Sequence, residues 1–311
     1  MHNRGELPYL CIRKNNKIME INMIFCLGAL AAMLLGGLCF RKIWGIIAPM
    51  LLLCVTISCC NIRYSDNRQR SKKPIPLEDR AKMVRSDALE IPKYQSGEAI
   101  KEYFGYTVFY NSITLTPNCV AYQLTSTHTD GPYSRKGLRF VQDPDCPWPQ
   151  AEDADYKGSG YSRGHLVPAG DMKWDSVAMR ECFYFTNCIP QDTKFNNGKW
   201  NQLEERTRRL AKEYGTVYVV CGPVYEQRDT IRIGANGVAV PHKCFKALMV
   251  PKDGSYSAIG FIMSNGGEER EVMDCACTID SLESVVGMDL FCNLPDKLEK
   301  NVESTVVWED W

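Results

Sequence analysis

The chain has 311 residues, of which 45% are hydrophobic and 24% charged, and its formal net charge at pH 7 is zero. This length is enough for one large domain or two small ones with a full core. Residues 1–75 hold 11 of the 37 Lys and Arg but only 3 of the 37 Asp and Glu, which leaves 26 basic against 34 acidic residues in the remainder. The acidic remainder excludes a protein that coats nucleic acid with a broad basic surface, so any phosphate contact must use a local patch.

Two apolar runs occupy the N-terminal part of the chain. Residues 21–40 carry no charge and are long enough to span a bilayer. Residues 43–60 resemble an export signal that ends near Cys59 or Cys60, where a lipid can be attached as in bacterial lipoproteins. Both runs can insert, or the second can act as a signal alone, and a start site assigned too early would also produce two runs. In each case we expect residues 1–60 to be a membrane-targeting segment.

Residues 61–97 are polar and basic with recurring prolines, which predicts a linker. The folded domain is then expected at residues 98–311. Nine of the 15 cysteines lie in this domain, without a CxxC pair or a Cys/His cluster at zinc spacing, so no structural zinc is expected. One or two disulfides can form in an oxidising compartment. The cysteines in apolar segments, Cys182, Cys188 and Cys221, are also consistent with buried free thiols.

The first half of the domain predicts strands and one short helix. Residues 105–128 are rich in Tyr, Val, Thr and Ile around a Thr-Pro pair, which favours two strands and a turn. Residues 137–145 are expected to extend this sheet. A short helix is expected at 175–181, and the aromatic run at 182–190 predicts a buried strand.

The second half predicts a long helix and further strands. In residues 196–214, Trp200, Leu203, Leu210 and Tyr214 recur at helical spacing, and Gly215 ends the pattern. We expect an α+β domain with a mostly antiparallel sheet and flanking helices. Its remaining elements are predicted strands at 216–225, 244–250 and 256–264, and predicted helices at 279–286 and 295–301.

The stretch YSRGHLVPAGDMKW, residues 161–174, contains one of only four histidines in the chain, His165. Gly164 and Pro168 break regular structure on either side and allow the imidazole to be exposed. A lone histidine in a loop is more often a surface hydrogen-bonding residue than a catalyst. An imidazole with a pKa near ~6.5 can nevertheless take a proton from water at neutral pH.

Four residues of the long helix, Asn196, Trp200, Glu204 and Arg208, are spaced by four and share one side. This pattern is also typical of a solvated face with a Glu to Arg pair, and Trp200 is expected to pack in the core rather than stack on bases. Asn196 would stand at the helix start, where unpaired N–H groups favour anions. Combined with His165, these side chains suit phosphodiester cleavage with one divalent cation.

Three motifs agree in order and spacing: RGH at 163–165, TNCIPQ at 186–191 and NNGKWNQLE at 196–204. Together they resemble the DNA/RNA non-specific endonucleases, and most closely the endonuclease G-like members. The resemblance covers roughly residues 104–300 and implies a ββα-metal fold. It also implies Mg²⁺, or another divalent cation such as Mn²⁺, with His165 as general base, Asn196 as the only direct protein ligand and Glu204 orienting the hydrated metal.

The resemblance further implies arginines that contact the substrate phosphate. Arg163 and Arg208 match this role, and Arg139 is a further candidate. Members of the family cleave DNA and RNA to leave 5′-phosphate ends, and many are homodimers. One position departs from the family, because the usual DRGH is SRGH here, with Ser162 in place of the aspartate. We expect activity to be retained, since the residues with direct chemistry are present.

A second hypothesis is a membrane-tethered nucleic-acid-binding protein with reduced or lost catalysis. Loss of His165 or Asn196 would favour it, and neither residue is lost. An enzyme that reads only the sugar-phosphate backbone cannot spare its own genome. We therefore expect a membrane-associated protein whose catalytic domain lies outside the cytoplasm, in the bacterial cell envelope or exported.

Overall fold

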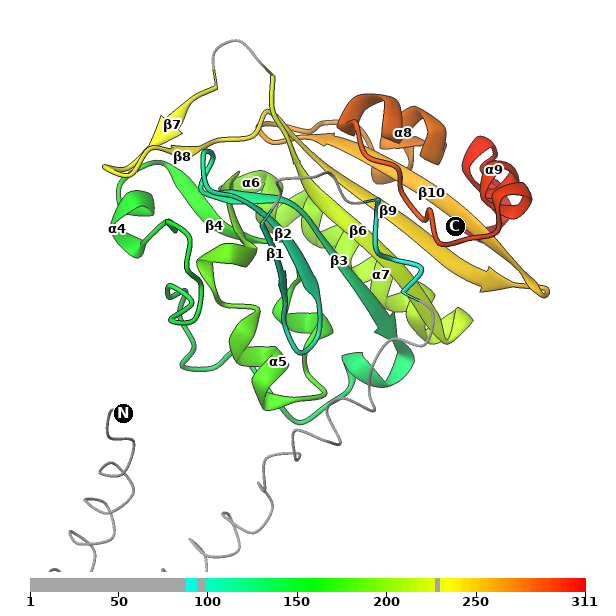
Figure 1. The fold of residues 1–311 in the computed structure, drawn as a ribbon, viewed down its shortest axis with the longest axis horizontal. Coiled ribbons are helices and arrows are strands. Elements are labelled where there is room, and N and C mark those ends of the chain that lie inside the picture. The colour runs from blue at the N-terminus through cyan, green and yellow to red at the C-terminus, as the bar shows by residue number, and fades with distance from the viewer. Residues whose placement is uncertain (1–87, 94–98, 227–229) are drawn as a thin grey trace, which may run out of the picture. The chain divides into compact units, whose positions relative to one another are not determined.

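The computed structural model describes residues 88–93, 99–226 and 230–311 (Figure 1). Both apolar runs, and most of the predicted linker, lie outside these ranges. Every helix within them is too short or too polar to cross a bilayer.

A seven-stranded sheet with the order β1-β2-β3-β6-β9-β10-β11 forms the centre of the domain (Figure 1). All pairs of neighbouring strands are antiparallel, which confirms the predicted α+β class. The hairpin from β9 to β10 turns at Asp253 and Gly254, both with positive φ, as a two-residue turn of this kind requires. The seven strands are β1 (Ala99–Glu102), β2 (Thr107–Asn111), β3 (Thr116–Thr125), β6 (Thr216–Val224), β9 (Lys243–Lys252), β10 (Ser255–Ser264) and β11 (Ala276–Cys277).

Two small sheets and six helices complete the described part of the chain. The strand pair β4–β5 is antiparallel and contains the RGH motif, and β7–β8 forms a short hairpin. The bounds are β4 (Tyr161–His165), β5 (Cys188–Asp192), β7 (Arg232–Ile233), β8 (Val238–Ala239), α4 (Asp153–Tyr156), α5 (Ser176–Glu181), α6 (Thr193–Phe195), α7 (Asn201–Tyr214), α8 (Ile279–Val286) and α9 (Asp296–Ser304).

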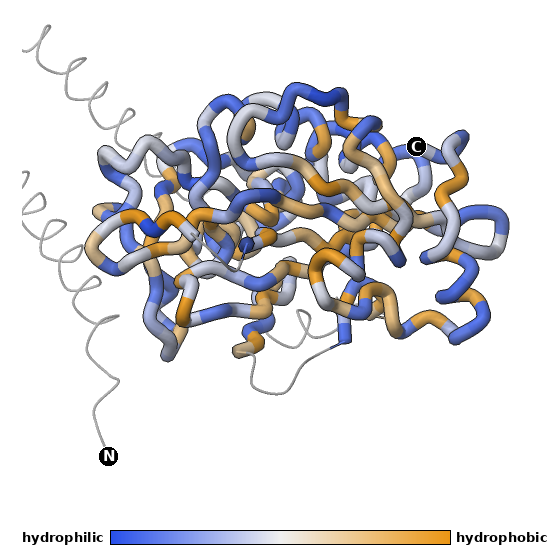
Figure 2. Tube along the Cα trace, turned by 90° about the horizontal axis from the view of Figure 1, so that it is seen from above, coloured by the Kyte–Doolittle hydropathy of each residue, from blue (hydrophilic) through white to orange (hydrophobic). Residues whose placement is uncertain are grey.

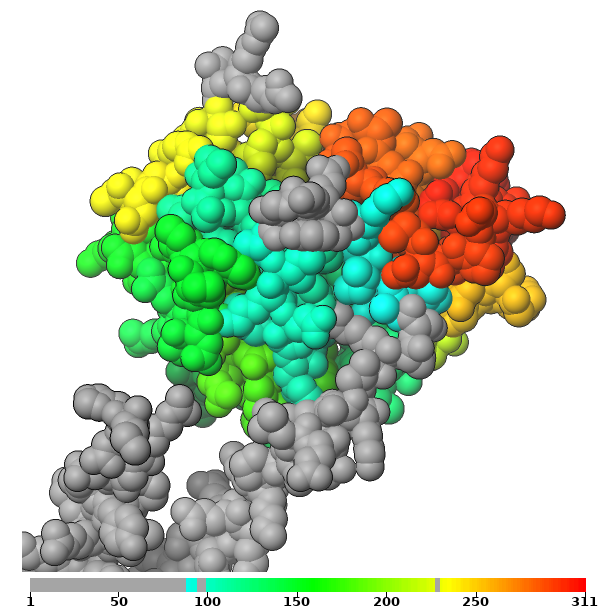
Figure 3. All heavy atoms as spheres, viewed as in Figure 1, coloured from blue at the N-terminus to red at the C-terminus, as the bar shows by residue number. Residues whose placement is uncertain are grey.

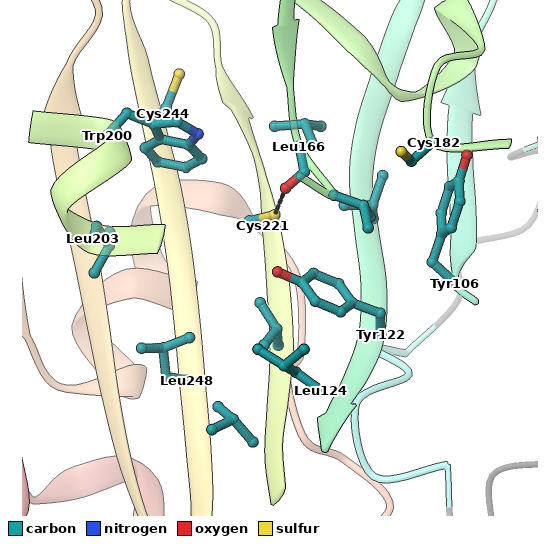
Figure 4. Close-up of a cluster of buried hydrophobic side chains, with 14 of the residues drawn as sticks. Tyr106, Tyr122, Leu124, Leu166, Cys182, Trp200, Leu203, Cys221, Cys244 and Leu248 are labelled. Atoms are coloured by element: carbon teal, nitrogen blue, oxygen red, sulfur yellow. Dashed lines mark hydrogen bonds between the residues drawn. The ribbon is translucent and has the colours of Figure 1, made fainter. Parts of the chain in front are cut away.

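The central sheet separates two hydrophobic cores, as β6 illustrates. Val219 and Cys221 contribute to the core beneath α7, whereas Val220 between them contributes to the core beneath α8 and α9. This alternation follows from the two-residue period of a strand. Trp200 and Leu203 face the strands on the α7 side (Figure 4). Hydrophilic stretches concentrate in the connecting segments (Figure 2).

Residues 88–93 fall within the predicted linker but pack against the domain. Leu89 is buried in the core beneath α8 and α9. The Lys93 amide donates to the Asp289 carbonyl at 2.8 Å, and the Asn293 side chain donates to the Ala88 carbonyl at 2.8 Å. The cyan segment beside the orange and red helices in Figure 3 includes these residues. The packed domain therefore begins before residue 98.

The predicted helix at 196–214 consists of a π-helical turn at Asn196–Trp200 followed by α7, and the short helix α6 precedes them. The Asp192 carboxylate caps α6 by accepting from the Lys194 and Phe195 amides. Because the Asn196 amide donates to the Thr193 carbonyl, the expectation of a free anion-binding helix end at Asn196 is wrong. The predicted helix end is confirmed, since Gly215 follows α7 with a φ of 80°.

Two predicted strands are wrong in detail, and two other predictions are confirmed. Residues 182–190 form a 3₁₀ turn at 185–187 before β5 instead of one strand, and within 137–145 only Val141 makes an isolated bridge. The helix at 175–181 is present as α5, which the Asp175 carboxylate caps. Trp200 is fully buried, as predicted.

The nine cysteines of the described domain are free thiols, with Cys182, Cys188 and Cys221 buried.

Gly222 of β6 allows the neighbouring strands β3 and β9 to approach closely. A Cβ there would lie 2.3 Å from the Asn118 carbonyl oxygen and 2.8 Å from the Phe245 ring. We expect Gly222→Ala to lower the free energy of unfolding by about 2 to 3 kcal/mol, because backbone cannot yield as a side chain does. Urea unfolding measures this loss. Gly266→Ala, with nothing within 4 Å of its Cβ, is the control, and equal effects of the two variants would contradict the argument.

Candidate active site

The RGH motif lies on β4, which pairs with β5 so that His165 stands opposite Cys188. The glycine of the motif has a steric cause. A Cβ at Gly164 would lie 2.1 Å from Oε1 of Gln191, the last residue of TNCIPQ. The two motifs are therefore packed against each other, and only glycine allows that approach.

The loop after His165 is fixed by the asparagine of the second motif. The Asn187 side chain accepts from the Val167 amide at 2.9 Å and donates to the carbonyls of Val167 and Cys182 at 3.0 and 2.8 Å. The Cys221 thiol donates to the Leu166 carbonyl at 3.3 Å, which ties this loop to β6 (Figure 4). The imidazole is thus carried by a segment that hydrogen bonds hold in place.

His165 lies in an aromatic pocket and is 9% exposed. Its ring centroid is 4.4 Å from that of Phe140 and 4.7 Å from that of Phe183. Nε2 is buried and has no hydrogen-bond partner among the described residues. Burial, and then the nearby Arg135 guanidinium, lower the pKa of His165 to about 3. The imidazole is therefore neutral at physiological pH.

Asn196 and Glu204 come after β5 and α6, on the π-helical turn and on α7. Both side chains are partly exposed and form no hydrogen bond with any described residue. Burial raises the pKa of Glu204 to about 7, and the Asp171 carboxylate adds to this effect, whereas Lys246 opposes it. π-helical turns within helices are frequent at functional sites. Two oxygen donors without a protein partner suit a hard divalent cation, so the residues present fit the metal that the sequence implies.

Arg208 lies beside the buried carboxylate of Asp171. Its Nη1 donates to Asp171 Oδ1 at 2.9 Å, and the Tyr122 hydroxyl donates to Oδ2 at 2.9 Å. Asp171 is fully buried, and Arg208 also lowers the pKa of Glu204. Arg208 is therefore held next to Glu204 by a buried ion pair.

Arg163 is directed toward α4. Its Nη2 contacts both the carbonyl and the carboxylate of Asp153 at 2.7 Å, and its guanidinium lies over the Tyr156 ring at 5.3 Å. Ser162, the departure from the family motif, shares a hydrogen bond of 2.8 Å with the Thr193 hydroxyl. That bond joins β4 to the first residue of α6 and gives Ser162 a role in shaping the loop.

Sequence reasoning missed two basic residues of the site. Arg135 acts on both His165 and Glu204 and lies 5.7 Å from the Phe183 ring, whereas the predicted Arg139 is exposed and makes no ion pair within the described residues. No sequence signal singles out Arg135 among the basic residues of its loop.

Lys246 on β9 is the second residue that was missed. It is fully buried, lies 4.8 Å from the Trp200 ring centroid, and its Nζ has no hydrogen-bond partner among the described residues. The sequence carried a signal for it, because a lysine interrupts the apolar strand CFKALMV at an inward position.

Comparison with known proteins identifies the class. Residues 86–297 match the model of the DNA/RNA non-specific endonuclease family, so the chain belongs to that family and is a nuclease. The mitochondrial nuclease EXOG of Xenopus laevis is 33% identical over 249 residues, which cover 75% of this chain and 68% of that protein. The mitochondrial endonuclease G of Caenorhabditis elegans is 33% identical over 72% of this chain and 79% of its own length. The match to human EXOG covers only 58% of that protein.

A solved structure supports the same class. EndoG in the crystal structure of the EndoG/EndoGI complex is similar with a TM-score of 0.63 and 27% identity, over 70% of this chain and 94% of that one. The predicted resemblance to endonuclease G-like nucleases and the ββα-metal fold are thereby confirmed.

The predicted localisation, a bacterial membrane-associated protein with an extracytoplasmic catalytic domain, is wrong. The similar EXOG and endonuclease G proteins are named mitochondrial nucleases. Apolar runs do not by themselves distinguish export from other targeting. A nuclease that reads only the sugar-phosphate backbone must be kept apart from the genome. This requirement does not specify which membrane separates the two.

The buried cation of Lys246 generates a prediction. Lys246→Met removes the positive charge that most strongly lowers the pKa of Glu204. If the pKa of Glu204 rises by about one unit, its ionised fraction at pH 7 falls about fivefold, so we expect nuclease activity to fall about fivefold at pH 7, and to fall more at pH 6 than at pH 8. Lys243→Met, at an exposed position of the same strand, is the control. A pH–rate profile that coincides with that of the wild type would refute this role.

Proposed function

We propose that this nuclease domain hydrolyses phosphodiester bonds of DNA and RNA with one divalent metal, Mg²⁺ or Mn²⁺, and with His165 as general base. The observation that carries the proposal is the pair of oxygen donors, Asn196 and Glu204, that have no hydrogen-bond partner among the described residues. They lie on the π-helical turn and α7, which come after β5, the strand paired with the histidine strand, and the short helix α6. Arg135 acts electrostatically on both His165 and Glu204, which supports a shared site.

In the proposed site Asn196 Oδ1 would hold the metal, and the Glu204 carboxylate would accept hydrogen bonds from its waters. A bound divalent cation would neutralise charge that develops on the phosphate and the leaving oxygen. The Glu204 carboxylate must be ionised for this role. Lys246, Arg208 and Arg135 all favour the ionised form.

His165 would take a proton from the attacking water. Since Nε2 is buried, we assign the accepting lone pair to Nδ1. The lowered pKa keeps the imidazole neutral and able to accept, and Arg135 opposes its protonation before the water arrives. With so low a pKa, His165 is a weak base, so its contribution would depend mainly on its position relative to the attacking water.

Cations around the site would contact the phosphate. Arg135 is exposed and carries no ion pair in the described chain, so it is free to bind a phosphate oxygen. Arg208 and Arg163 are held by Asp171 and Asp153 and would offer their remaining donors. Contacts of this kind read the backbone rather than the bases, which favours activity on both DNA and RNA. The role of Arg139, the 5′-phosphate ends and the homodimer stay predictions.

Removal of the base tests the proposal. We expect His165→Ala to slow plasmid cleavage in Mg²⁺ at least ~10²-fold, because proton transfer from water loses its acceptor. His242→Ala, a partly exposed histidine that precedes β9, should cleave like the wild type. Chelation of the metal should stop cleavage by all three proteins. Equal rates for His165→Ala and the wild type would disprove the assignment.

The raised pKa of Glu204 predicts a pH-dependent metal requirement. Below about pH 7 the carboxyl is protonated and cannot accept from metal-bound water. We expect the half-saturating Mg²⁺ concentration to rise about tenfold in total as the pH falls from 8 to 6, because the ionised fraction of Glu204 falls by about that factor. Initial rates against Mg²⁺ concentration at each pH measure it. His165, with its lowered pKa, stays neutral throughout this range. A constant Mg²⁺ requirement between pH 6 and 8 would contradict the role of Glu204.

A further inference from the structure

A second cluster of oxygen donors lies far from the RGH motif in the sequence, where α8 and α9 approach each other (Figures 1 and 3). Asp280 and Glu283 stand on α8, and Glu303 stands near the end of α9. One carboxylate oxygen from each of the three lies within 4.8 Å of the other two. Oxygens bound to one Ca²⁺ at ~2.4 Å are at most ~4.8 Å apart, so these three fit a single coordination sphere.

Glu303 distinguishes this cluster from an ordinary acidic surface. Asp280 is exposed and Glu283 is partly exposed, whereas Glu303 is only 7% exposed and reaches the pair from the other helix. Its Oε1 is buried and has no hydrogen-bond partner in the described part of the chain. A buried carboxylate without a partner is costly, and the end of a helix adds negative potential. The position therefore requires a cation or a proton.

No basic residue in the described part of the chain forms an ion pair with these three carboxylates. Burial is the largest cause that raises the pKa of Glu303 to about 8, and the charges that add most to it are all acidic: Glu283, Glu299, Asp280 and Asp289. The nearby Lys93 is paired with Asp289 at 3.2 Å. Among the described residues, none of the three clustered carboxylates forms an ion pair.

We propose that Asp280, Glu283 and Glu303 bind a divalent cation of the calcium type, which joins α9 to α8. Three protein carboxylates, with room for water on the exposed side, suit Ca²⁺ better than Mg²⁺, which usually keeps most of its waters. The Leu290 amide donates to Glu283 Oε1 at 2.6 Å and steadies one ligand. The site goes beyond the nuclease chemistry, because α8 and α9 belong to the core on the sheet face opposite α7. Its occupancy stabilises the fold and leaves the catalytic residues unchanged.

Calcium binding by the full chain tests this site. In the Asn196→Ala background, which removes the proposed catalytic ligand, we expect one Ca²⁺ per chain by calorimetry. We also expect Tm to rise by about 4 °C or more at 100 times the Kd. Mg²⁺ alone should give a smaller rise. No rise with Ca²⁺, or an equal rise with Mg²⁺, would overturn the calcium assignment.

Substitution then locates the ion. Glu303→Gln keeps the shape of the side chain and should abolish both the bound Ca²⁺ and the rise in Tm. Its Tm without metal should equal or exceed that of the parent, since repulsion is relieved, which shows that the variant folds. Glu299→Gln, a neighbouring carboxylate outside the three, should keep the Ca²⁺ response. In the chain with Asn196 restored, Glu303→Gln should cleave plasmid like the wild type. An undiminished Ca²⁺ response in Glu303→Gln would refute the proposal independently of the nuclease mechanism.

Discussion

Charge buried between the central sheet and α7 is the constraint on which the site depends. Asp171 and Lys246 are both fully buried, and Arg208 forms an ion pair with Asp171. Leaving such charges uncompensated would cost several kcal/mol. Each therefore restricts the position of α7 relative to β9 and the loop after β4. Glu204 shares this environment, and its ionisation depends on the balance between the cations and Asp171.

Burial shifts the pKa values of His165 and Glu204 in opposite directions, and Arg135 acts on both. His165, enclosed by Phe140 and Phe183 and close to Arg135, is kept neutral. Burial raises the pKa of Glu204 to about 7, so nearby charges determine whether this carboxyl is ionised at neutral pH. In the proposed mechanism, a neutral His165 would accept a proton while an ionised Glu204 would bind metal-bound water, which is the division of roles that metal-assisted hydrolysis needs. Glu303, on the opposite face of the sheet, differs from Glu204 because the charged groups that most affect its pKa are all acidic.

Sequence patterns predicted the fold class and most elements, because helix and strand periods and glycine stops are local properties. They could not reveal the π-helical turn, which depends on the cap at Asp192 and the chain path after β5. The 3₁₀ turn before β5 was missed because an aromatic run reads as strand, whereas Asn187 binds the backbone of Val167 and Cys182 instead. Motif spacing singled out His165, Asn196 and Glu204, which lie on β4, the π-helical turn and α7. Motif spacing could not identify Arg135 or Lys246, because only tertiary packing brings them near the site.

We propose that the β4–β5 pair, the π-helical turn and α7 bring Asn196, Glu204 and His165 around one divalent cation. A crystal of the full chain soaked in Mn²⁺, with anomalous scattering recorded at the manganese edge, tests it most directly. We expect an anomalous peak bonded to Asn196 Oδ1, with its waters facing Glu204 on one side and the His165 imidazole on the other. No peak at Asn196 with Mn²⁺ in excess, or a peak whose waters reach neither Glu204 nor His165, would contradict it.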